Sequence, residues 1–166
     1  LAMTRETVRA LCQLNTEFYE RNAASFSQTR TAPWEGWRRC MAACGFDGLD
    51  DALGQSMDAQ IADSVLDIAC GNLRFEAFLA NTYPHVDWSF FAVDNCEPLV
   101  ASGQEDIAKK VHFTCEDIVS NLLEGLPAAE PANIPAFAAA TPFDLVVSFG
   151  FLHHIPSFDL RRQFLI

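Results

Sequence analysis

The sequence predicts an α/β fold in which a parallel sheet is covered by helices on both faces. Short apolar runs alternate with segments whose apolar residues recur at helical spacing. The runs are continuously apolar, as expected of strands that are buried on both faces. Apolar residues make up 50% of the 166 residues, so one domain of this length can bury a sizeable core.

The N-terminal part is expected to be a helical lead-in over residues 1–60, followed by the main domain at 61–166. Helical spacing in the lead-in predicts three helices, at 5–24, 34–44 and 49–60. Pro33 suits the start of the second helix, and Gly45 suits its end.

In the main domain, strands are expected at 64–69, 88–93, 111–115 and 143–149. The helices between and after them are expected around Phe75–Leu79 and at 98–108, 117–123 and 156–166. The Ala- and Pro-rich stretch at 127–142 is expected to be a loop. Ligands of such sheets bind at the carboxyl ends of the strands, so the residues just after each strand are candidates for a site.

The first strand is followed by Asp67-Ile-Ala-Cys-Gly71-Asn-Leu73, which opens a helix. Gly71 lets the backbone approach a ligand closely, and the helix start adds free N–H donors. Dinucleotide sites need G-x-G-x-x-G to seat a pyrophosphate, whereas this loop has one glycine. Leu73 is expected to narrow the loop, and Ala69 to be a mild change from glycine if its φ is negative. The pattern therefore favours a ligand without a pyrophosphate.

Acidic residues follow three strands in register. Asp94 ends the second strand, where a carboxylate can accept the two hydroxyls of a ribose. Asp117 follows the third strand, where it can cap the next helix or accept an exocyclic amine. Asp67 can hydrogen-bond the loop or attract a cation. Each is equally well explained alone as a structural cap, but together they indicate a site.

These motifs resemble those of class I, Rossmann-like methyltransferases. Residues 65–75 resemble the first motif, Phe91-Ala-Val-Asp94 the second, 113–118 the third, and 143–155 the fourth, including its His pair. The resemblance covers about residues 60–160 and implies S-adenosyl-L-methionine as cofactor. The implied cofactor-binding residues are Asp67, Ala69, Cys70, Gly71, Asp94, Asn95, Glu116, Asp117, Ile118 and Ser148.

The segment at 18–34 resembles the lead-in of methyltransferases that complete modified wobble uridines in tRNA. In that group the lead-in folds over the cofactor, which implies that Tyr19 and Arg30 lie near its methionine moiety. Ordinary packing of an amphipathic helix explains the same residues equally well. His153 and His154 are the candidate catalytic residues, since a histidine can act as a base near neutral pH. Alternatively, one caps the strand end and the other faces solvent.

The predicted function is methyl transfer from S-adenosylmethionine to a nucleophile, with a small molecule favoured over tRNA as acceptor. The net charge is −11, and residues 46–160 carry three basic residues against 18 acidic ones. Phosphate binding requires clustered Lys and Arg, which only residues 1–45 offer. The alternatives are a tRNA-modifying enzyme, a cofactor-binding module without turnover and, more weakly, a nicotinamide oxidoreductase.

Neither a metal site nor a membrane partner is expected. The six cysteines form no C-x-x-C pair, and no histidine lies at zinc-like spacing. They are interpreted as free thiols of a cytoplasmic protein. No segment reaches the roughly 18 apolar residues that a membrane-spanning helix needs. The resembling family has seven strands in the order 3-2-1-4-5-7-6, so the four strands here indicate a fragment whose fourth strand is an exposed edge.

Overall fold

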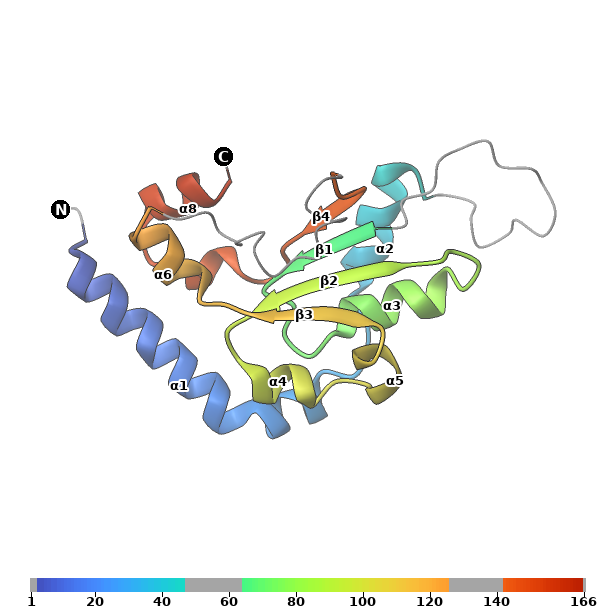
Figure 1. The fold of residues 1–166 in the computed structure, drawn as a ribbon, viewed down its shortest axis with the longest axis horizontal. Coiled ribbons are helices and arrows are strands. Elements are labelled where there is room, and N and C mark those ends of the chain that lie inside the picture. Colours follow the sequence, from blue (N-terminus) through green and yellow to red (C-terminus); the bar gives the residue numbers. More distant parts are fainter. Residues whose placement is uncertain (1–2, 47–63, 126–141, 166) are drawn as a thin grey trace.

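The computed structural model of the chain describes residues 3–46, 64–125 and 142–165. Its four described strands form one sheet in the order β3-β2-β1-β4, and every neighbouring pair is parallel (Figure 1). The strands are β1 (Ser64–Ile68), β2 (Ser89–Asp94), β3 (Val111–Cys115) and β4 (Leu145–Val147). The predicted Rossmann-like α/β fold and the predicted order of its first four strands are thus confirmed.

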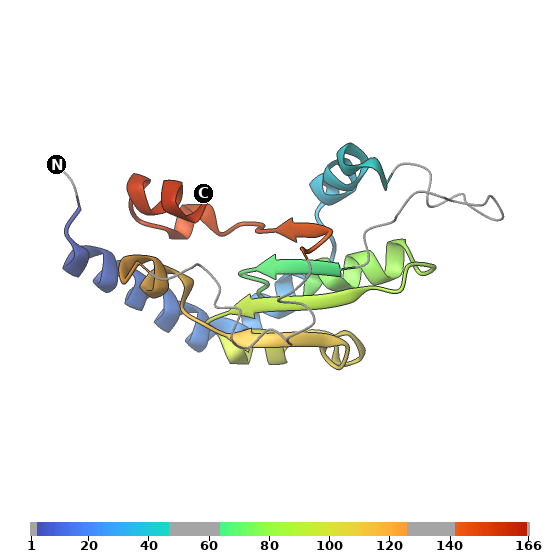
Figure 2. The same ribbon diagram turned by 45° about the horizontal axis from the view of Figure 1, so that its top comes forward.

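Helices pack on both faces of the sheet because neighbouring residues of a strand point to opposite faces. Val65 of β1 packs with α2 (Glu35–Met41) and α3 (Arg74–Thr82). Leu66, the next residue, packs with α6 (Ile118–Leu123) and α8 (Phe158–Phe164). Figure 2 shows α8 on the side of the sheet opposite α3. The short helices α4 (Glu97–Ala101) and α5 (Glu105–Ala108) extend the α3 side.

Helix α1 (Arg5–Thr29) passes the carboxyl ends of the strands (Figure 1). Thr4 caps its start by accepting a hydrogen bond from the backbone N–H of Thr7. Val8 packs near α6 and α8, whereas Ala23 packs against Leu99 of α4. The helix is five residues longer than the predicted 5–24. It therefore reaches from one side of the sheet to the other across the edge where a ligand is expected.

Three predicted elements differ in extent from the observed ones. The helix expected at 98–108 is divided into α4 and α5 at Gly103, where a Cβ would lie 2.7 Å from the carbonyl oxygen of Asn72. Among the described strands, β4 pairs with β1 alone. It is shorter than 143–149, and its Val146 is 56% exposed. Helix α2 ends at Met41 and continues as a wider turn, η1 (Ala42–Phe46), in which Gly45 has φ 90°. The helix expected at 49–60 and nearly all of the expected loop at 127–142 lie outside the described residues.

The loop between β1 and α3 contains three left-handed residues at alternate positions. Their φ angles are 67° at Ala69, 60° at Gly71 and 57° at Leu73. Ala69 was expected to be a mild change from glycine only if its φ were negative. Its φ is positive, so this expectation does not hold. Leu73 does not narrow the loop, since its side chain is 1% exposed and packs with Ala77 and Ala92 in the core. Its burial offsets the conformational strain.

Glycine at position 69 should stabilise the protein. An L-residue in the left-handed region costs roughly 1–2 kcal/mol, part of which the greater chain entropy of glycine offsets. We expect Ala69→Gly to raise the free energy of unfolding, measured in urea, by about 1 kcal/mol. Leu73→Gly relieves the same strain but removes a buried leucine, so it should lower the free energy by about 2 kcal/mol or more. Destabilisation by both substitutions would contradict the strain at Ala69.

Candidate functional site

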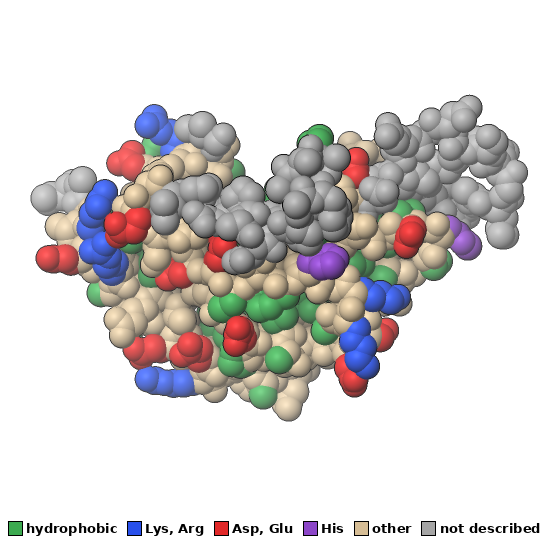
Figure 3. All heavy atoms as spheres, viewed as in Figure 1, with side chains coloured by type: hydrophobic (Ala, Val, Ile, Leu, Met, Phe, Trp, Pro, Cys, Tyr) green, Lys and Arg blue, Asp and Glu red, His purple; other side chains and the backbone are tan. Residues whose placement is uncertain are grey.

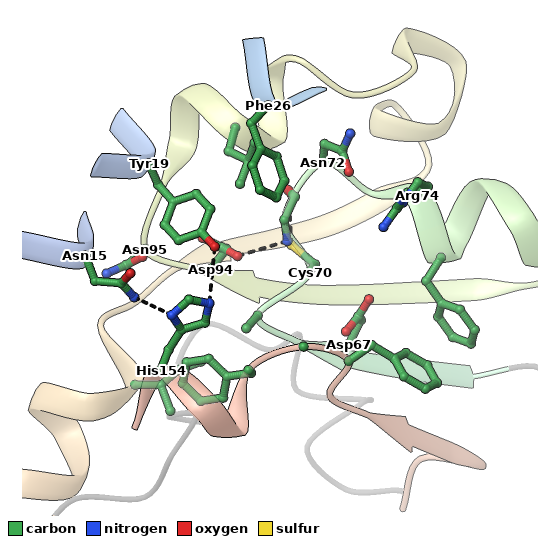
Figure 4. A pocket seen from close by; sticks show the side chains of 18 of the residues that line it. Asn15, Tyr19, Phe26, Asp67, Cys70, Asn72, Arg74, Asp94, Asn95 and His154 are labelled. Carbon is green, nitrogen blue, oxygen red and sulfur yellow. Dashed lines mark hydrogen bonds between the residues drawn. The ribbon is translucent and has the colours of Figure 1, made fainter. Parts of the chain in front are cut away.

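A pocket of about 260 Å³ lies between α1 and the carboxyl ends of the strands (Figure 4). It contains every sequence-predicted site residue except Ser148, whose place is taken by Phe149 and Gly150. The predicted residues that line it are Tyr19, Arg30, Asp67, Ala69, Cys70, Gly71, Asp94, Asn95, Glu116, Asp117, Ile118, His153 and His154. Parallel strands bring these segments together because their carboxyl ends lie at one edge of the sheet.

Asp94 holds the first loop in place. One of its carboxylate oxygens accepts the backbone N–H of Gly71 at 2.9 Å, and the other accepts that of Cys96 at 2.9 Å. Burial raises the pKa of Asp94, and the hydrogen bonds from Gly71, Cys96 and Asn95 oppose this effect. A carboxylate has about four lone-pair sites. Asp94 can therefore keep its backbone bonds and still accept a hydroxyl group of a ligand.

The third acidic segment starts α6. Asp117 caps this helix by accepting the backbone N–H of Ser120 at 3.0 Å and its hydroxyl at 2.8 Å. The backbone N–H of Glu116 donates to the carbonyl oxygen of Asp94 at 3.0 Å. The cap predicted at Asp117 is thus confirmed, and the bond from Glu116 ties this segment to the end of β2.

Asp67 is 3% exposed and lies on the floor of the pocket. The first of its two proposed roles, hydrogen bonding to the loop, is wrong. Within the described residues Asp67 makes no such bond, and its Oδ1 has no partner. Asp94 makes the bond to the loop instead. Burial raises the pKa of Asp67 well above its usual range, and the neighbouring carboxylates Glu76 and Asp94 raise it further.

His154 connects α1 to the turn after β4, η4 (Leu152–His154). As the Asn15 amide is oriented, its Nδ2 donates to His154 Nδ1 at 2.9 Å. The ring proton then lies on Nε2, which donates to the hydroxyl oxygen of Tyr19 at 3.1 Å (Figure 4). Burial, followed by the neighbouring His153, lowers the pKa of His154. The neutral His154 ring thus contacts α1 through both of its nitrogens.

His153 is exposed and also lines the pocket. It stacks near His154, with 3.9 Å between ring centroids, and makes no hydrogen bond within the described part of the chain. Of the two histidines, His153 has its ring nitrogens available to a ligand in this arrangement.

Helix α1 makes a second contact with the site through Thr16, whose hydroxyl accepts the side-chain N–H of Asn95 at 3.0 Å.

Sequence reasoning missed the residues that anchor the segment directly after α1. Asn72 donates to the carbonyl oxygen of Arg30 at 3.3 Å, and Arg74 donates to that of Ala32 at 3.1 Å. The Arg74 guanidinium also lies 5.3 Å from the ring centre of Trp34 and 5.2 Å from that of Trp37. The available signals in the sequence were the two tryptophans and the polar residues after Gly71. Because about 40 residues separate the two segments, their contact could not be predicted from the sequence.

The surface carries mixed charge. In the face shown in Figure 3, Lys and Arg side chains lie near the outline, with Asp and Glu side chains among them. All six cysteines are free thiols. In the described ranges, no three metal-binding side chains cluster. None of the helices described is long and apolar enough to span a membrane.

Comparisons with known proteins give similarities to solved structures alone. A search of solved structures finds the plantazolicin methyltransferase BpumL, crystallised with a pentazolic desmethylPZN analog and SAH. The sequence identity is 18% and the TM-score is 0.44. The similarity covers 98% of this chain and 56% of that one, so the chain spans little more than half the length of this neighbour. No protein-family model and no curated protein matches the chain.

The two acidic residues at the strand ends should respond differently to amide substitution. Asp94→Asn replaces one acceptor by an NH₂ group opposite a backbone N–H, so we expect it to lower the free energy of unfolding by about 1–3 kcal/mol. Asp117→Asn should change it by less than about 0.5 kcal/mol, since Asn and Asp cap helices equally well. Urea unfolding without ligand measures both. Equal effects would show that the bonds of Asp94 to the loop contribute little.

Proposed function

We propose that this chain is the cofactor-binding part of an S-adenosylmethionine-dependent methyltransferase. The observation that carries the proposal is the convergence of Asp67, Asp94 and Asp117, one from each of three strand ends, on a single pocket behind a left-handed loop. An adenosine ligand with a cationic sulfonium and no phosphate suits this lining. A pyrophosphate would be repelled by the same carboxylates.

The residues present fit the parts of such a cofactor. Asp94 has lone pairs left for ribose hydroxyls, while Glu116, Asp117 and Ile118 lie where an adenine ring would sit. Asp67 offers an unpartnered, buried oxygen to a cationic group. Tyr19 and Arg30 line the same pocket from the lead-in, which suits the methionine moiety. The bound cofactor would supply an electrophilic methyl group.

The protein's contribution to transfer is alignment and exclusion of water. Helix α1 lies over the pocket and is held there by Tyr19 and Asn15, through His154. His153 is the residue placed to remove a proton from an acceptor, because it is exposed and lines the pocket. The alternative of a binding module without turnover predicts the same ligand and no methylated product.

A small molecule is the acceptor class that the charge supports best. Arg30 and Arg74 are the only Arg or Lys residues lining the described pocket, where they face several carboxylates. An RNA acceptor would need a basic surface around the opening. The lead-in resemblance supports tRNA as the second candidate.

S-adenosylmethionine and S-adenosylhomocysteine should raise the melting temperature, and NAD should not. Ligands that bind only the folded state stabilise it in proportion to the logarithm of their concentration over Kd. A thermal-shift titration with the three ligands measures this. Equal stabilisation by NAD would contradict the proposed cofactor.

Asp94→Ala should weaken cofactor binding by about 2–3 kcal/mol in protein that is still folded, the scale for losing a charged hydrogen-bond acceptor. Asp106→Ala, at an exposed acidic residue in the first turn of α5, is the matched control and should bind normally. Isothermal titration gives both affinities. An unchanged Kd for Asp94→Ala would show that this carboxylate only organises the loop.

The chain should not bind tRNA measurably at physiological salt. Its net charge of −11 opposes a polyanion, and the local excess of Arg in residues 1–45 is small. A gel-shift series at rising salt concentrations tests this expectation. Tight binding with a steep salt dependence would favour the tRNA acceptor instead.

A further inference from the structure

Two carboxyl groups are buried together beneath the pocket. Asp67 at the end of β1 is 3% exposed, and Glu76 in the first turn of α3 is 0% exposed. After burial itself, Glu76 is the group that raises the pKa of Asp67 most, which means that the two carboxyl groups lie close together. Neither Asp67 Oδ1 nor either oxygen of Glu76 receives a hydrogen bond from the side chain of any other described residue. Two ionised carboxylates repel each other at close range, whereas one proton shared between them turns the repulsion into a hydrogen bond.

The surroundings of the pair disfavour a double negative charge. Phe75, Trp37 and Phe149 form an aromatic cluster on this face of the sheet, and Val147 of β4 lies beside Asp67. In the described part of the chain, no lysine or arginine forms a salt bridge with either carboxyl group. An uncompensated second charge in such a site is costly, so retaining one proton is the favourable state.

The charged groups near Asp67 and Glu76 also favour a protonated pair. Asp94 on β2 adds to the effect of burial on the pKa of Asp67. Burial also raises the pKa of the Cys70 thiol, and Glu76, Asp94 and Asp67 raise it further. The Arg74 guanidinium binds Ala32 and lies against the tryptophan rings. Burial raises the pKa of Glu76 to about 7. A cationic ligand at Asp67 would be the missing positive partner.

We propose that Glu76 is a positioning residue that shares one proton with Asp67, and that binding of the cationic cofactor releases this proton to solvent. Before binding, the pair has one proton and a charge of −1. Afterwards it has no proton and a charge of −2, which the cation balances. Only Asp67 lines the pocket, so Glu76 acts through Asp67. This inference rests on the proposed function.

The shared proton is tested first without ligand. In the wild type, both carboxyls bind protons more tightly when folded, so the free energy of unfolding should fall as pH rises from about 4 to beyond 7. Glu76→Gln donates its amide hydrogen to Asp67 and should flatten this decline. Glu105→Gln, the same change at an exposed carboxyl on α5, should keep the wild-type slope. Identical slopes in the wild type and Glu76→Gln would overturn the shared proton.

Proton release is tested by isothermal titration with S-adenosylmethionine at pH 7, in buffers of different ionisation enthalpy. The wild type and Glu105→Gln should release a measurable fraction of one proton, and their Kd should fall up to about tenfold per pH unit. Glu76→Gln should lose this release. The α-amino group of the ligand titrates near pH 8 in all of them, so the difference between proteins is the readout. If Glu76→Gln does not fold, Asp67→Asn, which also replaces one carboxyl of the pair by an amide donor, takes its place in the stability experiment and should flatten the decline in the same way.

Equal proton release by the wild type and Glu76→Gln, or none by the wild type, would overturn the inference while leaving the proposed function standing. Absence of cofactor binding in every protein and at every pH would instead overturn the proposed function, and proton release with it. In that case the slopes of stability against pH, which need no ligand, still decide whether Asp67 and Glu76 share a proton.

Discussion

The pair of hydrogen bonds accepted by Asp94 is the interaction on which the site depends. Gly71 belongs to the loop after β1, and Cys96 to the segment after β2, so one carboxylate fixes two strand ends relative to each other. The third strand end joins through the bond from Glu116 to the Asp94 carbonyl. With the loops fixed in this way, the Asp94 carboxylate has a set position in the lining of the pocket. The same residue thus serves the fold and the candidate site.

The lead-in completes the pocket by contacts that its own sequence spacing does not show. Helix α1 buries few side chains and is held by polar contacts, of which the His154 contacts with Asn15 and Tyr19 lie over the pocket. Polar contacts at a partly exposed position contribute modestly to stability. A helix held in this way can open at low cost, which suits the proposed entry of a cofactor and an acceptor.

The left-handed loop shows how the fold accommodates departures from glycine. Leu73 has a positive φ, yet its side chain fills the core with Ala77 and Ala92, away from the ligand side. Sequence reasoning treated Leu73 as an obstacle because it considered the space in the loop and not the direction of the side chain. Ala69 lines the pocket and has no comparable burial to offset its strain.

The sequence by itself determined where the four strands lie and that the residues after them meet at one edge of the sheet, whereas the order of the strands came from the resemblance to a family. The local signals for these are strong, since a buried strand is a short apolar run and the residues after parallel strands must meet at one edge. Only the tertiary structure decided which carboxylate holds the loop, the break between α4 and α5 at Gly103, and the contacts of Asn72 and Arg74 with the lead-in. It also decided the burial of Glu76, which in sequence looks like an ordinary acidic residue in a first helical turn. Each of these depends on distances between segments far apart in the chain, which no local pattern encodes.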